Sequence, residues 1–102
     1  MNMGELMKQA QQFQERLANI QSDLAGKQVT GSAGAGMVTT TFNGKGELLR
    51  LAIEEQLVRP ENVQMLQDLI LAAVNDGLRK AKEQEKAEMV KLTGGMQIPG
   101  LI

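Results

Sequence analysis

The chain has 102 residues, which is the length of a single domain. Its formal net charge is −1 and its pI is near 5.4, so it has no overall basic character. It contains no Cys and no His, which excludes thiol nucleophiles, disulfides, the usual zinc sites and Ser-His triads. The only aromatic residues are two Phe, which leave almost nothing for stacking on unpaired bases.

No segment is typical of membrane insertion or export. The longest unbroken apolar run, residues 69–74, is too short to span a bilayer. The first residues lack the basic start and apolar stretch of a signal peptide. We therefore expect a cytoplasmic protein with no membrane partner.

Residues 1–26 are expected to form a long helix. Apolar residues recur there at alternating spacings of three and four, at Met3, Leu6, Ala10, Phe13, Leu17, Ile20 and Leu24. This spacing is typical of a helix that packs on another helix along a narrow seam. Gly26 suits the C-terminal end of that helix.

Residues 27–53 change to a β pattern. Two runs rich in β-branched residues are followed by a third apolar run over 48–53. The segment Asn43-Gly44-Lys45-Gly46 supplies the positive-φ residues of a tight hairpin between the second and third runs. We predict a three-stranded antiparallel meander whose third strand turns three side chains toward the helices, namely Leu49, Leu51 and Ile53.

A glycine-rich segment, residues 31–36, connects the first two β runs. Its order is Gly-x-x-Gly-x-Gly, and the element that follows is a strand, whereas phosphate-binding loops open a helix. We interpret the segment as a tight turn or bulge rather than a nucleotide site.

We predict a second long helix over residues 60–92, with Pro60 at its first position. Gly77 weakens it by about 1 kcal/mol relative to Ala. The helix is apolar nearly all round over 69–74 and rich in Lys and Glu after Gly77, so we expect burial first and a solvated arm afterwards. Residues 93–102 form an apolar tail that either docks or frays.

Charge is segregated along the chain. Residues 51–76 hold one Arg against five Asp and Glu, whereas residues 77–102 hold five Lys and Arg against three Glu. Arg79, Lys82 and Lys86 fall on one stripe of the last helix. A solvated helix face also explains this stripe, unless a second copy doubles it and presents it to an acidic polymer.

Carboxylates are the candidates for chemistry, at Glu54, Glu55, Glu61 and Asp68. No nucleophile, base and orienting group can be assembled around them, so we predict no catalytic residue, no metal site, no cofactor and no small-molecule substrate. Glu85 lies within the apolar stripe of the last helix. An unpaired buried carboxylate would be costly, so we expect this part of the arm to be open to solvent.

The apolar run and the scarcity of aromatic residues indicate that the chain pairs with itself. The residues expected at this two-fold interface are Leu69, Ile70, Leu71 and Val74.

Short motifs occur in every predicted element. After the heptad helix come Gly-Ser-Ala-Gly-Ala-Gly-Met-Val at 31–38, Asn-Gly-Lys-Gly-Glu at 43–47, Met-Leu-Gln-Asp-Leu-Ile at 65–70, Ala-Ala-Val-Asn-Asp at 72–76, Lys-Leu-Thr-Gly-Gly at 91–95 and Pro-Gly-Leu at 99–101. Together they resemble the YbaB/EbfC family of bacterial nucleoid-associated proteins over essentially the whole chain. Arg59, ahead of Pro60, departs from the small or acidic helix cap expected there.

The resemblance implies a single α+β domain over residues 1–102, comprising a helix (1–26), a β-meander (27–53), a helix (60–92) and a tail (93–102). It further implies a tweezers-like homodimer in the cytoplasm, at the nucleoid, whose helical arms contact double-stranded DNA. The implied role is chromosome organisation or gene regulation, without enzymatic activity.

The resemblance attributes DNA contacts to the first and last helices. On this sequence the implied residues are Lys8, Gln12, Arg16, Arg79, Lys82 and Lys86. No set of side chains is typical of base readout, so we expect binding that is largely insensitive to sequence. The alternative is a dimeric protein-interaction adaptor without direct DNA binding, which the acidic pI and the lack of stacking residues favour.

Overall fold

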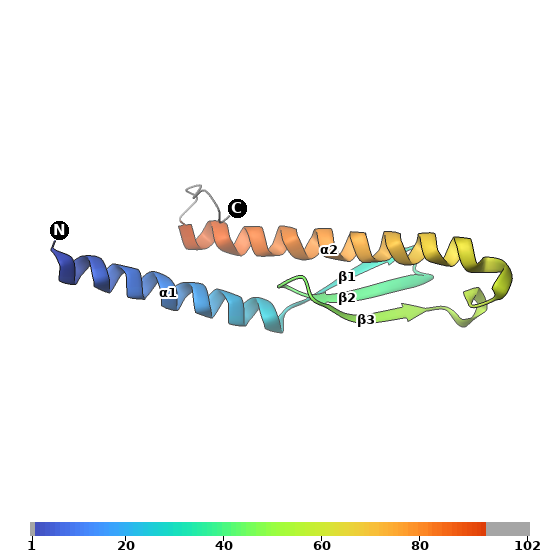
Figure 1. The fold of residues 1–102 in the computed structure, drawn as a ribbon, viewed down its shortest axis with the longest axis horizontal. Coiled ribbons are helices and arrows are strands. Elements are labelled where there is room, and N and C mark those ends of the chain that lie inside the picture. The colour runs from blue at the N-terminus through green and yellow to red at the C-terminus, as the bar shows by residue number, and fades with distance from the viewer. Residues whose placement is uncertain (1, 94–102) are drawn as a thin grey trace.

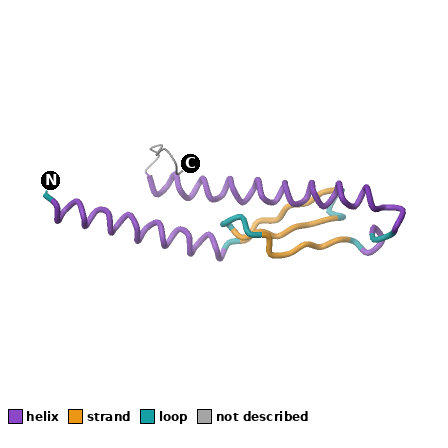
Figure 2. Tube along the Cα trace, in the orientation of Figure 1, coloured by secondary structure: helices purple, strands orange, loops and turns teal. Residues whose placement is uncertain are grey.

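The computed structural model describes residues 2–93 and shows an elongated molecule of 69 × 22 × 17 Å. Two long helices run antiparallel to each other, and a small sheet lies beside one end of the second helix (Figures 1 and 2). The elements are α1 (Met3–Gly26), β1 (Gln28–Ala33), β2 (Val38–Asn43), β3 (Leu48–Ile53), the 3-10 turns η1 (Glu55–Leu57) and η2 (Pro60–Asn62), and α2 (Val63–Thr93). The predicted α+β fold is confirmed, while the predicted tail, apart from Thr93, lies outside the described residues.

The three strands form an antiparallel sheet in the order β1-β2-β3. The tight turn predicted over residues 31–36 is confirmed only in its second half, where Gly34, Ala35 and Gly36 all have positive φ. Residues 31–33 belong to β1 instead, because they pair with β2. The N-terminal half of α2 lies across β1 and β2, and the core between them is centred on Val38, Leu57 and Ala73. On one face of the sheet, this helix thus covers β1 and β2 and leaves β3 largely uncovered.

Two glycines let α2 lie directly on the sheet. A Cβ on Gly77 would lie 2.5 Å from a ring carbon of Phe42, and a Cβ on Gly31 would lie 2.5 Å from the carbonyl oxygen of Ala73. The buried Thr40 hydroxyl donates a hydrogen bond of 2.8 Å to that same carbonyl. Gly77, which weakens the helix when considered alone, is therefore required by the packing.

The third strand is largely uncovered. Its register pairs Leu51 with Thr40 and Ile53 with Val38, which places Leu51 and Ile53 on the face toward α2, as predicted. The prediction for Leu49 is not confirmed, because the register shifts between Thr41 and Phe42 and Leu48 pairs with Phe42 instead. Leu49 and Leu51 are 52% and 42% exposed, since α2 lies over β1 and β2. The sheet ends in an apolar edge that the described part of the chain does not cover.

The heptad seam of α1 is only partly used. Leu24 is buried and Ile20 is half-buried near α2, whereas Met3 and Leu6 are exposed. The C-terminal end of α1 is held in place, since the carbonyl oxygen of Leu24 accepts a 2.8 Å hydrogen bond from the Gly44 amide. The predicted helix-on-helix packing is therefore found in the second half of α1.

Candidate nucleic-acid interface

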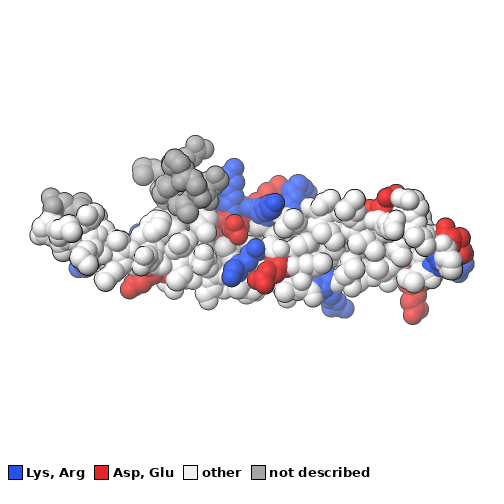
Figure 3. Space-filling view, viewed as in Figure 1, with Lys and Arg blue, Asp and Glu red and all other residues white. Residues whose placement is uncertain are grey.

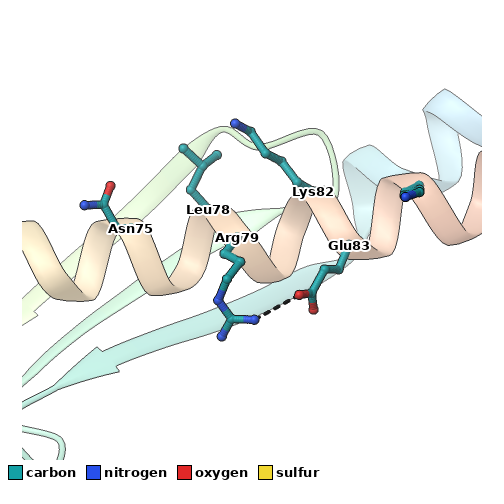
Figure 4. A pocket seen from close by; sticks show the side chains of 6 residues that line it. Asn75, Leu78, Arg79, Lys82 and Glu83 are labelled. Atoms are coloured by element: carbon teal, nitrogen blue, oxygen red, sulfur yellow. Dashed lines mark hydrogen bonds and ion pairs between the residues drawn. The ribbon is translucent and has the colours of Figure 1, made fainter. Parts of the chain in front are cut away.

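The cationic stripe predicted on the last helix lies along one groove of the structure. Arg79, Lys82 and Lys86 line a cavity of about 410 Å³ together with Asn75, Leu78 and Glu83 (Figure 4). Lys and Arg side chains gather over the C-terminal half of α2 in Figure 3, with Asp and Glu among them. Since α2 is a continuous helix, these cations are displayed on a rigid support.

Arg79 is held by neighbouring carboxylates. Its guanidinium forms ion pairs of 3.1 Å with Asp76 and 2.9 Å with Glu83, and these bonds raise the pKa of Arg79. In Figure 4 Arg79 points toward Glu83, away from Lys82. Lys82 and Lys86 make no ion pair within residues 2–93, so they are the members of the stripe whose charge is available to an anion.

Asp76 joins the sheet to the arm. It accepts a 3.0 Å hydrogen bond from the Ser32 amide on β1, and it forms ion pairs of 3.1 Å with both Lys80 and Arg79. The Ser32 amide is the largest cause, and the Lys80 ammonium the next, of a pKa of Asp76 held below its usual 3.8. Asp76 thus offsets the positive charges of Lys80 and Arg79 at the place where α2 leaves the sheet.

The three residues predicted on α1 are all exposed, but the structure does not bring them together with the α2 stripe. Arg16 lines a groove of about 420 Å³ between the helices, with Asn19 and Ile20 of α1 and Glu88, Lys91 and Leu92 of α2. Lys8 and Gln12 lie nearer the N-terminus and do not line it. Arg16 is therefore the α1 cation that lies closest to the end of α2.

Glu88 offsets two further cations beside this groove. Its Oε1 atom accepts bonds of 3.1 Å from Lys27 and 3.2 Å from Lys91, and these two ammonium groups, Lys27 first, lower the pKa of Glu88. The pair with Lys27 connects the end of α1 to α2. Like Arg79, these lysines each have a carboxylate partner within the chain.

The expectation that α2 is open to solvent around Glu85 is wrong. Ala81 is fully buried and Glu85 is half-buried, because the β2–β3 turn lies against this part of the helix. Lys45 and Gly46 of the turn line a hollow of about 130 Å³ with Leu78, Ala81, Lys82 and Glu85. Sequence reasoning treated Lys45 only as a turn residue, since nothing local indicated its proximity to Lys82.

The four residues predicted at a dimer interface lie on different sides of α2. Leu69 and Ile70 pack against the chain's own core, and Val74 is half-buried. Leu71 is 63% exposed, although the apolar run around it predicted burial on several sides. Of the four, Leu71 is the one whose side chain is exposed and could contact a second copy.

The acidic residues do not assemble a metal site. Within the described part of the chain no three Asp, Glu, His or Cys side chains lie close enough to hold a metal ion. No helix among residues 2–93 is long and apolar enough to cross a membrane.

The elongated protein displays two lysines, Lys82 and Lys86, that make no ion pair within residues 2–93 along one groove, which is a surface suited to an anionic partner. The sequence identifies it more closely: the chain belongs to the YbaB/EbfC DNA-binding family, which matches residues 1–96. This confirms the predicted resemblance and the predicted class, a DNA-binding protein rather than an enzyme.

Similar proteins cover nearly the whole chain. It is 52% identical to a nucleoid-associated protein of Desulfotalea psychrophila, over 99% of this chain and 95% of that protein. It is 47% identical to a nucleoid-associated protein of Clostridium acetobutylicum, over 98% of this chain and 89% of that protein. The crystal structure of an uncharacterized Helicobacter pylori protein matches with a TM-score of 0.85 at 26% identity, covering 92% of this chain and 99% of that one.

Proposed function

We propose that this chain forms a homodimer at the nucleoid that holds double-stranded DNA by its phosphates, with Lys82 and Lys86 as the main contacts. The observation that carries the proposal is the state of the cations on α2. Lys82 and Lys86 line a groove without an ion pair in the described residues, whereas Arg79 and Lys80 are engaged by carboxylates. Free ammonium groups on a rigid helix are the usual partners of DNA phosphates.

The uncovered apolar surface supports the homodimer. Leu49 and Leu51 of the edge strand and Leu71 of α2 are all more than 40% exposed. An exposed edge strand offers unpaired backbone groups to another chain, and a two-fold axis would cover both copies at once. A dimer also doubles the cations, so that two arms can engage one duplex, as in the tweezers shape that the family resemblance implies.

Binding through phosphates leads to a general role on the chromosome. The groove residues include no pair of side chains arranged for base readout, so affinity is expected to vary little with sequence. Such a protein would influence chromosome organisation or gene expression through coverage of DNA. Residues Lys8, Gln12 and Arg16 of α1 are proposed as secondary contacts.

A salt-dependent binding measurement tests the proposal. Fluorescence anisotropy with random-sequence duplex at several salt concentrations gives the slope of log Kd against log salt, which counts the phosphates engaged. The double variant Lys82→Glu, Lys86→Glu is expected to lose binding while keeping its fold. A single charge reversal ahead of the opposite end of α2, Arg59→Glu, is the positional control and is expected to bind much as wild type does.

The competing function is a protein-interaction adaptor, which the exposed apolar residues of α1 favour, namely Met3, Leu6 and Met7. If the folded Lys82, Lys86 double variant bound duplex as tightly as wild type, the stripe would be no more than a solvated helix face. Wild-type protein that bound no duplex at low salt would support the adaptor instead.

A further inference from the structure

The turn between β2 and β3 is a rigid platform at the base of the arm. The nearly buried Asn43 organises it: its Oδ1 atom accepts 3.0 Å hydrogen bonds from the amides of Lys45 and Glu47. Its Nδ2 atom donates to the Glu47 carboxylate at 3.0 Å, and Gly46, with φ of +88°, donates its amide to the Asn43 carbonyl. The backbone that carries Lys45 is therefore preorganised.

This turn is wedged between the two helices. The Gly44 amide donates to the carbonyl oxygens of Leu24 and Lys27 at the end of α1, and a Cβ on Gly44 would lie 2.7 Å from the former. On the other side a Cβ on Gly46 would lie 3.5 Å from Leu78 of α2. The position of Lys45 relative to α2 is consequently fixed.

Lys45 extends the cationic groove of α2. It lines a hollow with Leu78 and Lys82, and both of these also line the groove that contains Lys86. Figure 4 shows Lys82 and Leu78 on the side of α2 where the hairpin passes. Lys45 is exposed and makes no ion pair within residues 2–93, and the nearby Glu47 is bonded to Asn43.

We propose that Lys45 is a phosphate-binding residue, so that the DNA interface continues from the arm onto the hairpin turn. This rests on the proposed function, and it adds an element outside the two helices. An ammonium on a preorganised turn loses little conformational freedom of its backbone when it meets a phosphate. Glu85 lines the same hollow and makes no ion pair with either lysine within residues 2–93, so it lowers the local potential without occupying the Lys45 ammonium.

The test removes this charge and counts phosphates. Lys45→Gln is expected to weaken binding to random-sequence duplex several-fold at low salt. It should also lower the slope of log Kd against log salt by about 1 for each phosphate that the variant no longer engages. The control Arg59→Gln removes the same charge at the far end of the molecule and should leave the slope unchanged. Lys45→Arg keeps the charge and should retain the wild-type slope.

The outcomes separate this inference from the proposed function. If Lys45→Gln keeps the wild-type slope while Lys82→Gln lowers it, Lys45 does not touch DNA and the proposed function stands. If neither variant changes the slope, both proposals fail. If Lys45→Arg loses as much slope as Lys45→Gln, the turn's shape rather than its charge is responsible, and the inference is overturned. Thermal unfolding checks that each variant is folded.

Discussion

Up to Gly77, α2 lies on β1 and β2 so closely that glycines stand where side chains would collide; beyond Gly77 it lies beside the hairpin turn and the end of α1. The first half has acidic surroundings, with one Arg against five Asp and Glu in residues 51–76, and the second half carries the cations. The closest packing of helix on sheet and the proposed DNA contacts are thus located in different halves of one helix. Charges of the arm should be replaceable without unfolding the sheet.

The largest effect on stability is expected from adding one methyl group on β1, where the N-terminal half of α2 packs against the sheet. In Gly31→Ala the new Cβ would meet the backbone of α2 at Ala73 and Gly77, which has no flexible end to move aside. We expect a loss of about 3 kcal/mol in the free energy of unfolding, measured by urea denaturation. The control Gly26→Ala has no atom within 4 Å of its Cβ and should be neutral or slightly stabilising. A neutral Gly31→Ala would contradict the close packing.

A second prediction tests whether a second copy covers the exposed apolar surface around Leu71, in the N-terminal half of α2. Leu71 is 63% exposed in one chain, so Leu71→Asp would cost a monomer little. In a dimer it would bury an unpaired carboxylate, and we expect dimerisation to weaken at least 100-fold, about 2.7 kcal/mol. Met3→Asp, at the tip of α1, is the control. Sedimentation that finds a stable wild-type monomer at micromolar concentration would overturn the dimer.

The parts of the fold that sequence could predict are those specified by local pattern. The spacing from Met3 to Leu24 predicts α1, and Asn43-Gly44-Lys45-Gly46 predicts the β2–β3 turn. The contact between Gly31 and Gly77 was not predictable, because it joins positions 46 apart and depends on how closely helix and sheet approach. Helix propensity alone predicts that Gly77 destabilises the protein, whereas the packing of α2 on the sheet requires a glycine there.

The candidate nucleic-acid interface could likewise be predicted from sequence only where its residues lie close together along the chain. Helical periodicity groups Arg79, Lys82 and Lys86, and the structure places all three in one groove. The spacing of four between Arg79 and Glu83 already allows an ion pair, which the stripe interpretation did not use. Lys45 could not be added from sequence, because only the folded chain brings the turn to α2.

A smaller effect is expected at the junction of the two halves, where Asp76 joins β1 to α2. Because the Ser32 amide and the Lys80 ammonium lower the pKa of Asp76 in the folded chain, its carboxylate stabilises the fold above the unfolded value near 3.8. This contribution is lost as the pH falls through the lower folded pKa. Asp76→Asn should therefore unfold at a lower temperature than wild type at neutral pH, and the difference should shrink as the solution is acidified below 3.8. A difference that stays constant with pH would indicate altered packing rather than the missing charge.

The smallest effect on stability is expected in the arm half, at Glu85. This half-buried carboxylate lies in the hollow formed with Lys45, Leu78, Ala81 and Lys82. Glu85→Leu places apolar surface against Leu78 and Ala81, so the free energy of unfolding should be unchanged or rise by up to about 1 kcal/mol. Removal of a negative charge beside two lysines should also tighten binding to duplex DNA a few-fold at low salt.

Glu85→Gln is the matched variant, since it removes the charge without adding apolar surface. It should tighten DNA binding as much as Glu85→Leu does, while leaving stability at the wild-type value. A loss of several kcal/mol in both variants would show that the carboxylate holds the arm together through a partner, and the division of α2 into a packed half and a replaceable charged half would then be wrong. If instead only Glu85→Leu tightened binding, apolar packing of the hollow rather than its charge would control how the arm meets DNA.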